Sequence, residues 1–317
     1  MSLKMKRILL RIAYDGTGYV GWQKQNNGLS VEEVINNALK KLTGEDIAVT
    51  GASRTDSGVH ALDNVAVFDT ASPIPGDKFS YALNRYLPGD IKVQSSTEVS
   101  DGFHPRYAVC RKIYEYSIYN AGQPNPLYDR FSSFVHYDLD VEAMNTAAGY
   151  LEGEHDFAAF CSAGAQVRTT VRSIYAAQCF VRSSYSVPAA AGENTGGALR
   201  ECDDVCRETD RMRSEAGAGC CETDRMFLEA GAKPDSSRMI VIRLTGNGFL
   251  YNMVRIIAGT LLQVGQGIYP PEHVKEILDS RDRAQAGPTA PPQGLVLKEI
   301  NYQDMESIRN YGRDQDQ

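Results

Sequence analysis

The sequence predicts an α+β protein made of two halves. Strand-like and helix-like segments alternate in the first third of the chain, and the alternation starts again after a boundary near residues 106–110. A length of 317 residues allows two modest domains, each with its own hydrophobic core. Apolar residues make up 42% of the chain and charged residues 23%, which is ordinary for a globular protein.

The first half follows the order β-α-β-β-α-β. Ser30 and Glu33 form a capping box that opens a helix, because each side chain can satisfy a free backbone N–H of the first turn. Apolar residues then recur at helical spacing, at Val31, Val34, Ile35, Ala38, Leu39 and Leu42. Strands are predicted at 6–14, 47–50, 64–69 and 91–97, and a second helix at 78–86. This is the ferredoxin-like order, which RNA-recognition modules and small-molecule α+β domains both use, so the order alone favours neither.

The second half alternates in the same way. Strands are predicted at 112–119, 170–181, 239–245 and 295–300, and helices at 141–151, 253–264 and 270–278. We place the first domain at 4–108 and the second at 109–302, with an active cleft between them and a polar tail at 303–317. The segment 183–237 fits neither half and is predicted to be a mobile insertion.

The insertion contains a short duplication, because Glu208-Thr209-Asp210-Arg211-Met212 recurs as Glu222-Thr223-Asp224-Arg225-Met226. With few large apolar residues, such a segment cannot bury enough surface to order itself. Four cysteines fall here, at Cys202, Cys206, Cys220 and Cys221. They lack the paired spacing of zinc sites, so we predict no metal, although a zinc site is the alternative.

The chain carries a net charge of −7, which weighs against a nucleic-acid partner without excluding one. A local basic groove can bind phosphates on a protein that is acidic overall. No window has the roughly 18 apolar residues of a membrane helix, and we expect no signal peptide, since Ile8-Leu9-Leu10 runs straight into Arg11. We therefore expect a cytoplasmic protein.

The most informative stretch is the polar loop 53–61, Ser-Arg-Thr-Asp-Ser-Gly-Val-His-Ala, between two predicted strands. Gly58 suits a tight bend, and small hydroxyl residues can fix the loop through local hydrogen bonds. We expect Asp56, close to Arg54, to stay ionised and able to act as a nucleophile or base. Taken alone, the pattern fits a solvated turn as well as a site.

This loop resembles the signature G-R-T-D-A-G-V-H of the pseudouridine synthases of the TruA type, with Ser53 and Ser57 in place of Gly and Ala. Further blocks in the order typical of the family strengthen the resemblance, and they span most of the chain outside the insertion. They are Tyr14–Gln25, Asn84–Ile91, Phe103–Arg106, Tyr114–Tyr116, Gly153–Phe157, Arg168–Arg172 and Asn247–Arg255.

The resemblance implies a continuous sheet with helices outside and a central cleft, and an isomerase that needs no cofactor. Asp56 matches the catalytic aspartate of the family, Tyr114 the tyrosine that stacks on the target base, and Arg255 the arginine that pairs with the carboxylate. Arg54 would fill the space of the flipped nucleotide or bind its phosphate. His60 would do likewise or stabilise the loop.

The resemblance further implies tRNA as partner, uridines 38–40 of the anticodon stem-loop as targets, and a homodimer. Phosphate contacts are expected from the basic residues of these blocks and their neighbours, namely Lys24, Arg106, Arg111, Lys112, Arg168 and Arg172. Two alternatives are a pseudouridine synthase for another RNA and a binding protein without catalysis. Retention of Asp56, Tyr114 and Arg255 together argues against the second, because binding alone needs no nucleophile.

Overall fold

The computed structural model describes residues 5–164, 167–182 and 237–303. Its strands are β1 Lys6–Tyr14, β2 Thr50–Gly51, β3 His60–Thr70, β4 Ile91–Val99, β5 Cys110–Asn120, β6 Ser133–Val135, β7 Gly153–Asp156, β8 Val171–Arg182, β9 Arg238–Gly246 and β10 Leu295–Tyr302. Its helices are α1 Val31–Thr43, α2 Phe79–Leu83, α3 Val141–Gly149, α6 Met253–Gly265 and α7 His273–Ser280. Apart from residues 237 and 303, the predicted insertion with its four cysteines and the predicted tail lie outside these ranges.

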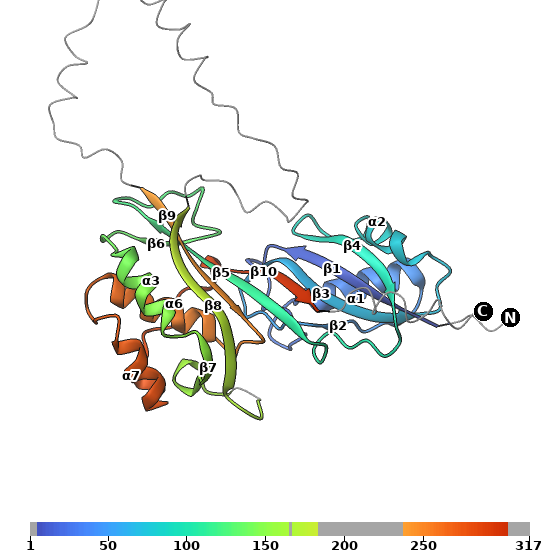
Figure 1. Ribbon diagram of the computed structural model, residues 1–317. Coiled ribbons are helices and arrows are strands. Elements are labelled where there is room, and N and C mark those ends of the chain that lie inside the picture. The colour runs from blue at the N-terminus through green and yellow to red at the C-terminus, as the bar shows by residue number, and fades with distance from the viewer. Residues whose placement is uncertain (1–4, 165–166, 183–236, 304–317) are drawn as a thin grey trace, which may run out of the picture. The chain divides into compact units, whose positions relative to one another are not determined.

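The ten strands form one mixed sheet in the order β4-β1-β3-β10-β5-β9-β8-β7, with β2 paired to β3 and β6 paired to β5. The last strand of the chain, β10, joins the two halves. It runs parallel to β3, with Val296 opposite His60, and antiparallel to β5, with Leu297 opposite Tyr114 (Figure 1). The α+β class and the continuous mixed sheet are therefore confirmed, while the division into domains at residue 108 stays a prediction.

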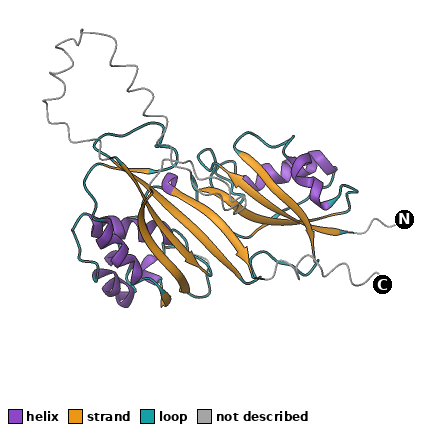
Figure 2. Cartoon of the chain, turned by 45° about the horizontal axis from the view of Figure 1, so that its top comes forward, coloured by secondary structure: helices purple, strands orange, loops and turns teal. Residues whose placement is uncertain are grey.

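The helices form two groups that pack on the sheet (Figure 2). Helix α1 begins as predicted, with the Ser30 hydroxyl accepting a hydrogen bond from the Glu33 backbone N–H at 3.2 Å. It buries Val31, Ile35, Ala38 and Leu39, which is the apolar stripe read from the sequence. Helix α6 is buried along most of its length, as its many apolar residues require.

Several elements differ from the prediction. The helix expected over 78–86 spans Phe79–Leu83 and continues as turns, in which the backbone N–H groups of Arg85 and Tyr86 donate to the carbonyls three residues earlier. The strand expected at 47–50 is the two-residue β2, and the strand expected at 64–69 reaches back to His60. The short strands β6 and β7 were not predicted. In the part of the chain that the structure describes, no helix is long and apolar enough to cross a membrane.

Candidate active site

The signature loop runs from β2 to β3 and is held in place by buried side chains. The Asn64 side-chain amide, on β3, donates to the Ser53 carbonyl at 3.1 Å. The Tyr14 hydroxyl, at the end of β1, lies 2.8 Å from the Thr55 hydroxyl. Since these anchors come from two neighbouring strands and are fully or nearly buried, the loop has a rigid base.

The Gly-rich segment after β1 packs directly on this loop. The Trp22 backbone N–H donates to the Thr55 carbonyl at 3.1 Å, and the Gly58 N–H donates to the Tyr19 carbonyl at 3.3 Å. Gly21 has a φ of +104°, and a β-carbon there would lie 2.6 Å from the Thr55 carbonyl oxygen. Only glycine permits both this backbone angle and this approach, so the two sequence blocks fit together as one unit.

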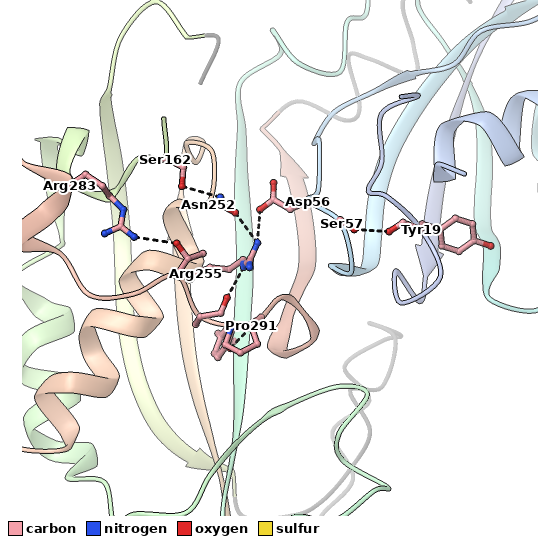
Figure 3. A network of polar contacts seen from close by, with 11 residues as sticks. Tyr19, Asp56, Ser57, Ser162, Asn252, Arg255, Arg283 and Pro291 are labelled. Carbon is pink, nitrogen blue, oxygen red and sulfur yellow. Dashed lines mark hydrogen bonds and ion pairs between the residues drawn. The ribbon is translucent and has the colours of Figure 1, made fainter. Parts of the chain in front are cut away.

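Asp56, at the centre of the loop, is paired with Arg255 from the first turn of α6. Asp56 Oδ2 and Arg255 Nη1 are 3.6 Å apart, and their side chains are only 20% and 15% exposed (Figure 3). Arg255 also donates through Nε to the Ala290 carbonyl at 2.7 Å. The structure therefore places Asp56 opposite Arg255. Arg54, the sequence neighbour expected to keep Asp56 ionised, is exposed.

Two opposing effects set the pKa of Asp56. Burial raises the pKa of Asp56 above its ordinary value, because a charged carboxylate is less stable away from water. The charge and hydrogen bonding of Arg255 act in the opposite direction and favour the carboxylate. The outcome is a desolvated acid whose ionisation depends on one guanidinium, which is the kind of group that serves in nucleophilic or general-base chemistry.

Asp56 faces a cavity of about 680 Å³, a volume typical of ligand sites. Tyr114 on β5 and Phe249, just before α6, also line it, and their rings meet edge to face with centroids 5.1 Å apart. Burial raises the pKa of Tyr114, so its phenol stays protonated at neutral pH. The structure thus brings Asp56, Arg255 and Tyr114 together from a loop, a helix and a strand.

Three basic residues predicted to contact RNA line the same cavity. Arg54 and Arg106 are exposed, and Lys112 is half-buried. Arg106 donates through Nε to the Gly51 carbonyl at 2.8 Å, and Lys112 donates through Nζ to the Ala52 carbonyl at 2.9 Å. Burial is the first cause that lowers the pKa of Lys112, and the neighbouring positive charges of Arg106 and Arg172 lower it further. The rim is therefore positively charged although the chain is acidic overall.

The structure does not bring His60 to the cavity. His60 is 4% exposed, and its Nδ1 accepts a hydrogen bond from the Gly16 backbone N–H at 3.0 Å. Burial lowers the pKa of His60, which is consistent with a neutral ring. Of the two roles left open by the sequence, the position of His60 fits the stabilisation of the loop, because its ring ties the Gly16 turn to β3.

The remaining predicted RNA contacts lie outside the cavity lining. Lys24 is exposed and lies 3.8 Å from the Glu33 carboxylate, and Arg168 is exposed. Arg111 points to the sheet face opposite Tyr114, because side chains alternate along β5, and its guanidinium lies over the Tyr175 ring at 5.3 Å. Arg172 donates through Nη1 to the carbonyls of Thr169 and Val171. Their contacts with RNA stay predictions.

Two polar residues of the site were missed by sequence reasoning. Asn252 accepts a hydrogen bond from Arg255 and donates one to Ser162 (Figure 3). Asn252 lies within the block 247–255, so its polar side chain beside Arg255 was a usable signal. Ser162 carried no signal, because it reaches the site only through the fold. Among the described residues, no group of three His, Cys, Asp or Glu side chains is placed to hold a metal ion.

Comparison with known proteins places this geometry in a family. The family model described as tRNA pseudouridine synthase matches residues 11–108 and 147–303. A tRNA pseudouridine synthase A of Ruminiclostridium cellulolyticum is 44% identical over 298 residues, which cover 94% of this chain and 100% of that protein. The tRNA pseudouridine synthase A of Caldicellulosiruptor bescii is 40% identical over the same shares of both chains.

The fold and these matches define the class of protein as an RNA pseudouridine synthase, which is an isomerase. The chain belongs to the tRNA pseudouridine synthase family.

Proposed function

We propose that this protein isomerises uridine to pseudouridine at positions 38–40 in the anticodon stem-loop of tRNA, with Asp56 as the nucleophile or base. The observation that carries the catalytic part is the pairing of the desolvated Asp56 with Arg255 at the wall of a cavity that Tyr114 also lines. The choice of these positions rests on the sequence resemblance, and the names of the relatives support tRNA as substrate.

The reaction cuts the bond between ribose C1′ and uracil N1 and joins C1′ to uracil C5. The reaction gains and loses no atom overall. The proton on C5 leaves as the new bond is made, and N1 acquires a proton. A carboxylate can assist in two ways, by adding to C1′ or C6 and later leaving, or by accepting a proton. Asp56 suits either route, because it is held at a fixed point by a rigid loop and its charge is balanced by Arg255.

The target uridine has to leave its base stack to reach Asp56, as happens in other enzymes that act on a base. Tyr114 and Phe249 offer an aromatic wall beside Asp56 on which the extruded uracil can stack. The phenol of Tyr114 stays protonated and is available to donate a hydrogen bond or a proton within the cavity. These residues therefore supply both binding and proton handling for the base.

Phosphates next to the target are proposed to contact the basic rim of Arg54, Arg106 and Lys112. Lys24, Arg168 and Arg172 are proposed to extend this contact along the RNA. A homodimer, in which one subunit docks the tRNA while the other presents its cavity, completes the proposal and rests on the resemblance. The compartment that we propose is the cytoplasm.

The test is to map pseudouridine in tRNA after incubation with the protein and with its Asp56→Ala and Asp56→Asn forms. Substrates in which uridines 38, 39 and 40 are replaced by cytidine, singly and all together, identify the target position. We expect the unmodified protein to form pseudouridine at these positions only. Both Asp56 variants should lose turnover while binding tRNA nearly as well as the parent, because the carboxylate contributes to chemistry rather than to phosphate binding.

Turnover by Asp56→Ala at the parent rate would falsify the catalytic assignment. Pseudouridine that survives replacement of all three uridines would instead redirect the proposal to another site or another RNA. Light scattering of the protein with and without tRNA tests the dimer, and a monomeric mass under both conditions would contradict it.

A further inference from the structure

Asn252 has an unusual backbone for its place in the fold. It directly precedes α6 and has φ 59° and ψ 6°, the left-handed region. Among the described residues, Asn252 and Arg281 are the non-glycine residues with positive φ. Asparagine tolerates this region better than most residues, but the conformation still costs free energy and is a feature that often accompanies functional sites.

The side chain of Asn252 does not do what an asparagine before a helix usually does. An N-cap asparagine adopts an extended backbone and accepts a hydrogen bond from an N–H of the first helical turn. Asn252 makes no such capping bond. Its side-chain amide is therefore available for other partners.

Those partners lie on both sides of the amide (Figure 3). Oδ1 of Asn252 accepts from Arg255 Nη1 at 2.8 Å, and Nδ2 donates to the Ser162 hydroxyl oxygen at 3.0 Å. The orientation of the amide is unambiguous, because a guanidinium has only donors and must face the oxygen. Ser162 is itself anchored, since its backbone N–H donates to the Tyr251 carbonyl at 3.2 Å.

The same nitrogen of Arg255 serves two groups. Nη1 is the atom that Asn252 holds and also the atom that lies 3.6 Å from Asp56 Oδ2. The other fixed point of Arg255 is Nε, which donates to the Ala290 carbonyl. An arginine side chain has many rotamers, and these two hydrogen bonds select the one in which the guanidinium faces Asp56.

We propose that Asn252, held by Ser162, is a positioning residue that keeps the Arg255 guanidinium against Asp56. This inference rests on the proposed function, in which the Asp56 carboxylate performs the chemistry. It assigns the left-handed turn before α6 a role in catalysis, because that backbone aims the amide at Arg255. Asn252 acts through Arg255, and Ser162 acts through Asn252.

The test is a double-mutant cycle between Asn252→Gly and Arg255→Gln, with kcat and KM for tRNA measured at mildly acidic pH. Glycine keeps the left-handed backbone and removes only the side chain. We expect Asn252→Gly to lower kcat about tenfold with KM within about twofold of the parent, because ground-state binding is not affected. In the Arg255→Gln background the same change should have almost no further effect, since a residue that acts through Arg255 has nothing left to position.

Two further variants sharpen the result. Arg281→Gly is the control, because it places glycine at the other left-handed position. It removes an exposed side chain that pairs with Asp156, and neither residue lines the cavity, so kcat should stay unchanged. Ser162→Ala frees the amide donor of Asn252 and should lower kcat a few-fold, again without effect in the Arg255→Gln background. If the circular dichroism spectrum of Asn252→Gly shows that this variant does not fold, Ser162→Ala still tests the inference.

Losses that multiply in the double variants would overturn the inference, because they would show that Asn252 or Ser162 acts independently of Arg255. An unchanged kcat for both Asn252→Gly and Ser162→Ala would overturn it as well. Failure of the proposed function looks different, since it would leave the Asp56→Ala variant active. Failure of this inference would leave Asp56 essential.

Discussion

Replacing Arg255 by glutamine removes the positive charge that counteracts the effect of burial on the pKa of Asp56. The two charges are 3.6 Å apart, which corresponds to an attraction of about 4–5 kcal/mol at an effective dielectric constant of about 20. Both side chains keep some exposure, 15% for Arg255 and 20% for Asp56, so water weakens the attraction. We take about half of it, about 2 kcal/mol, as the free energy by which Arg255 favours the ionised Asp56, which is about 30-fold in an equilibrium constant.

The sign of the effect follows from the charge. Loss of the guanidinium raises the pKa of Asp56 further, because burial then acts unopposed. On the acid side of the pH–rate profile, where the rate follows the ionised fraction, Arg255→Gln should therefore be about 30-fold slower than the parent. At higher pH, where Asp56 is ionised in both proteins, the rates should converge.

The assay is the single-turnover rate of pseudouridine formation over a range of pH, with enzyme in excess over tRNA so that binding does not limit the rate. Arg11→Gln is the matched control. Arg11 is paired with Asp63, and the two side chains are similarly half-buried, at 25% and 16% exposure. Both residues lie outside the cavity lining. The control should keep the profile of the parent.

An acid limb of Arg255→Gln that overlays the parent would refute the reasoning, because it would mean that Arg255 does not govern the charge of Asp56. A loss of equal size at every pH would also refute it. That pattern would assign Arg255 to the binding or orientation of the substrate instead.

Two further predictions concern stability and RNA binding. Glu115 is fully buried and bonded to Arg182 and Arg243, so Glu115→Gln should lower the free energy of unfolding in urea by about 3 kcal/mol at neutral pH, since it leaves both arginines without their anion. Burial alone would raise the pKa of Glu115, but Arg243, Lys298 and Arg182 outweigh burial and lower that pKa. The stabilisation is therefore present above the unfolded-state pKa of Glu115 and is lost as the pH falls through its folded-state pKa. A difference in unfolding free energy between the two proteins that stays constant in acid would contradict this. Arg54→Gln should reduce the slope of log Kd against log salt for tRNA by about one unit, because it removes an exposed guanidinium from the cavity rim. Lys78→Gln, at a lysine already paired with Asp77, is its control, and equal slopes for Arg54→Gln and the parent would remove Arg54 from the interface.

Local elements were predictable wherever one strong signal acted alone. Helix α1 begins at the capping box and buries the apolar stripe read from the sequence, and β1 has the predicted limits Lys6–Tyr14. The short strands β6 and β7 escaped because three or four residues carry too little alternation to predict. The second helix was too long in the prediction because its end tightens into turns with i→i−3 hydrogen bonds, which residue spacing does not distinguish from an α-helix.

For the partner of Asp56 the sequence offered two arginines. Sequence proximity favoured Arg54 as this partner, and the family resemblance favoured Arg255. In the fold Arg255 of α6 lies beside Asp56, and Arg54 is exposed. His60 belongs to the same loop block as Asp56, yet it begins β3 and points to the Gly16 turn. A block of residues in the sequence identifies a loop, but the direction of each side chain depends on the strands at its ends.

The amino-acid sequence by itself determined the α+β class and the family, and it singled out Asp56 as the candidate carboxylate, because these depend on residue types and short spacings that survive without knowledge of the fold. Only the tertiary structure decided that β10 lies between β3 and β5, that Arg255 Nη1 lies 3.6 Å from Asp56 Oδ2, and that Asn252 and Ser162 hold Arg255 through hydrogen bonds. The physical reason is that a hydrogen bond or ion pair depends on distance in space, and segments far apart in the chain come within reach only when the sheet and its helices pack together.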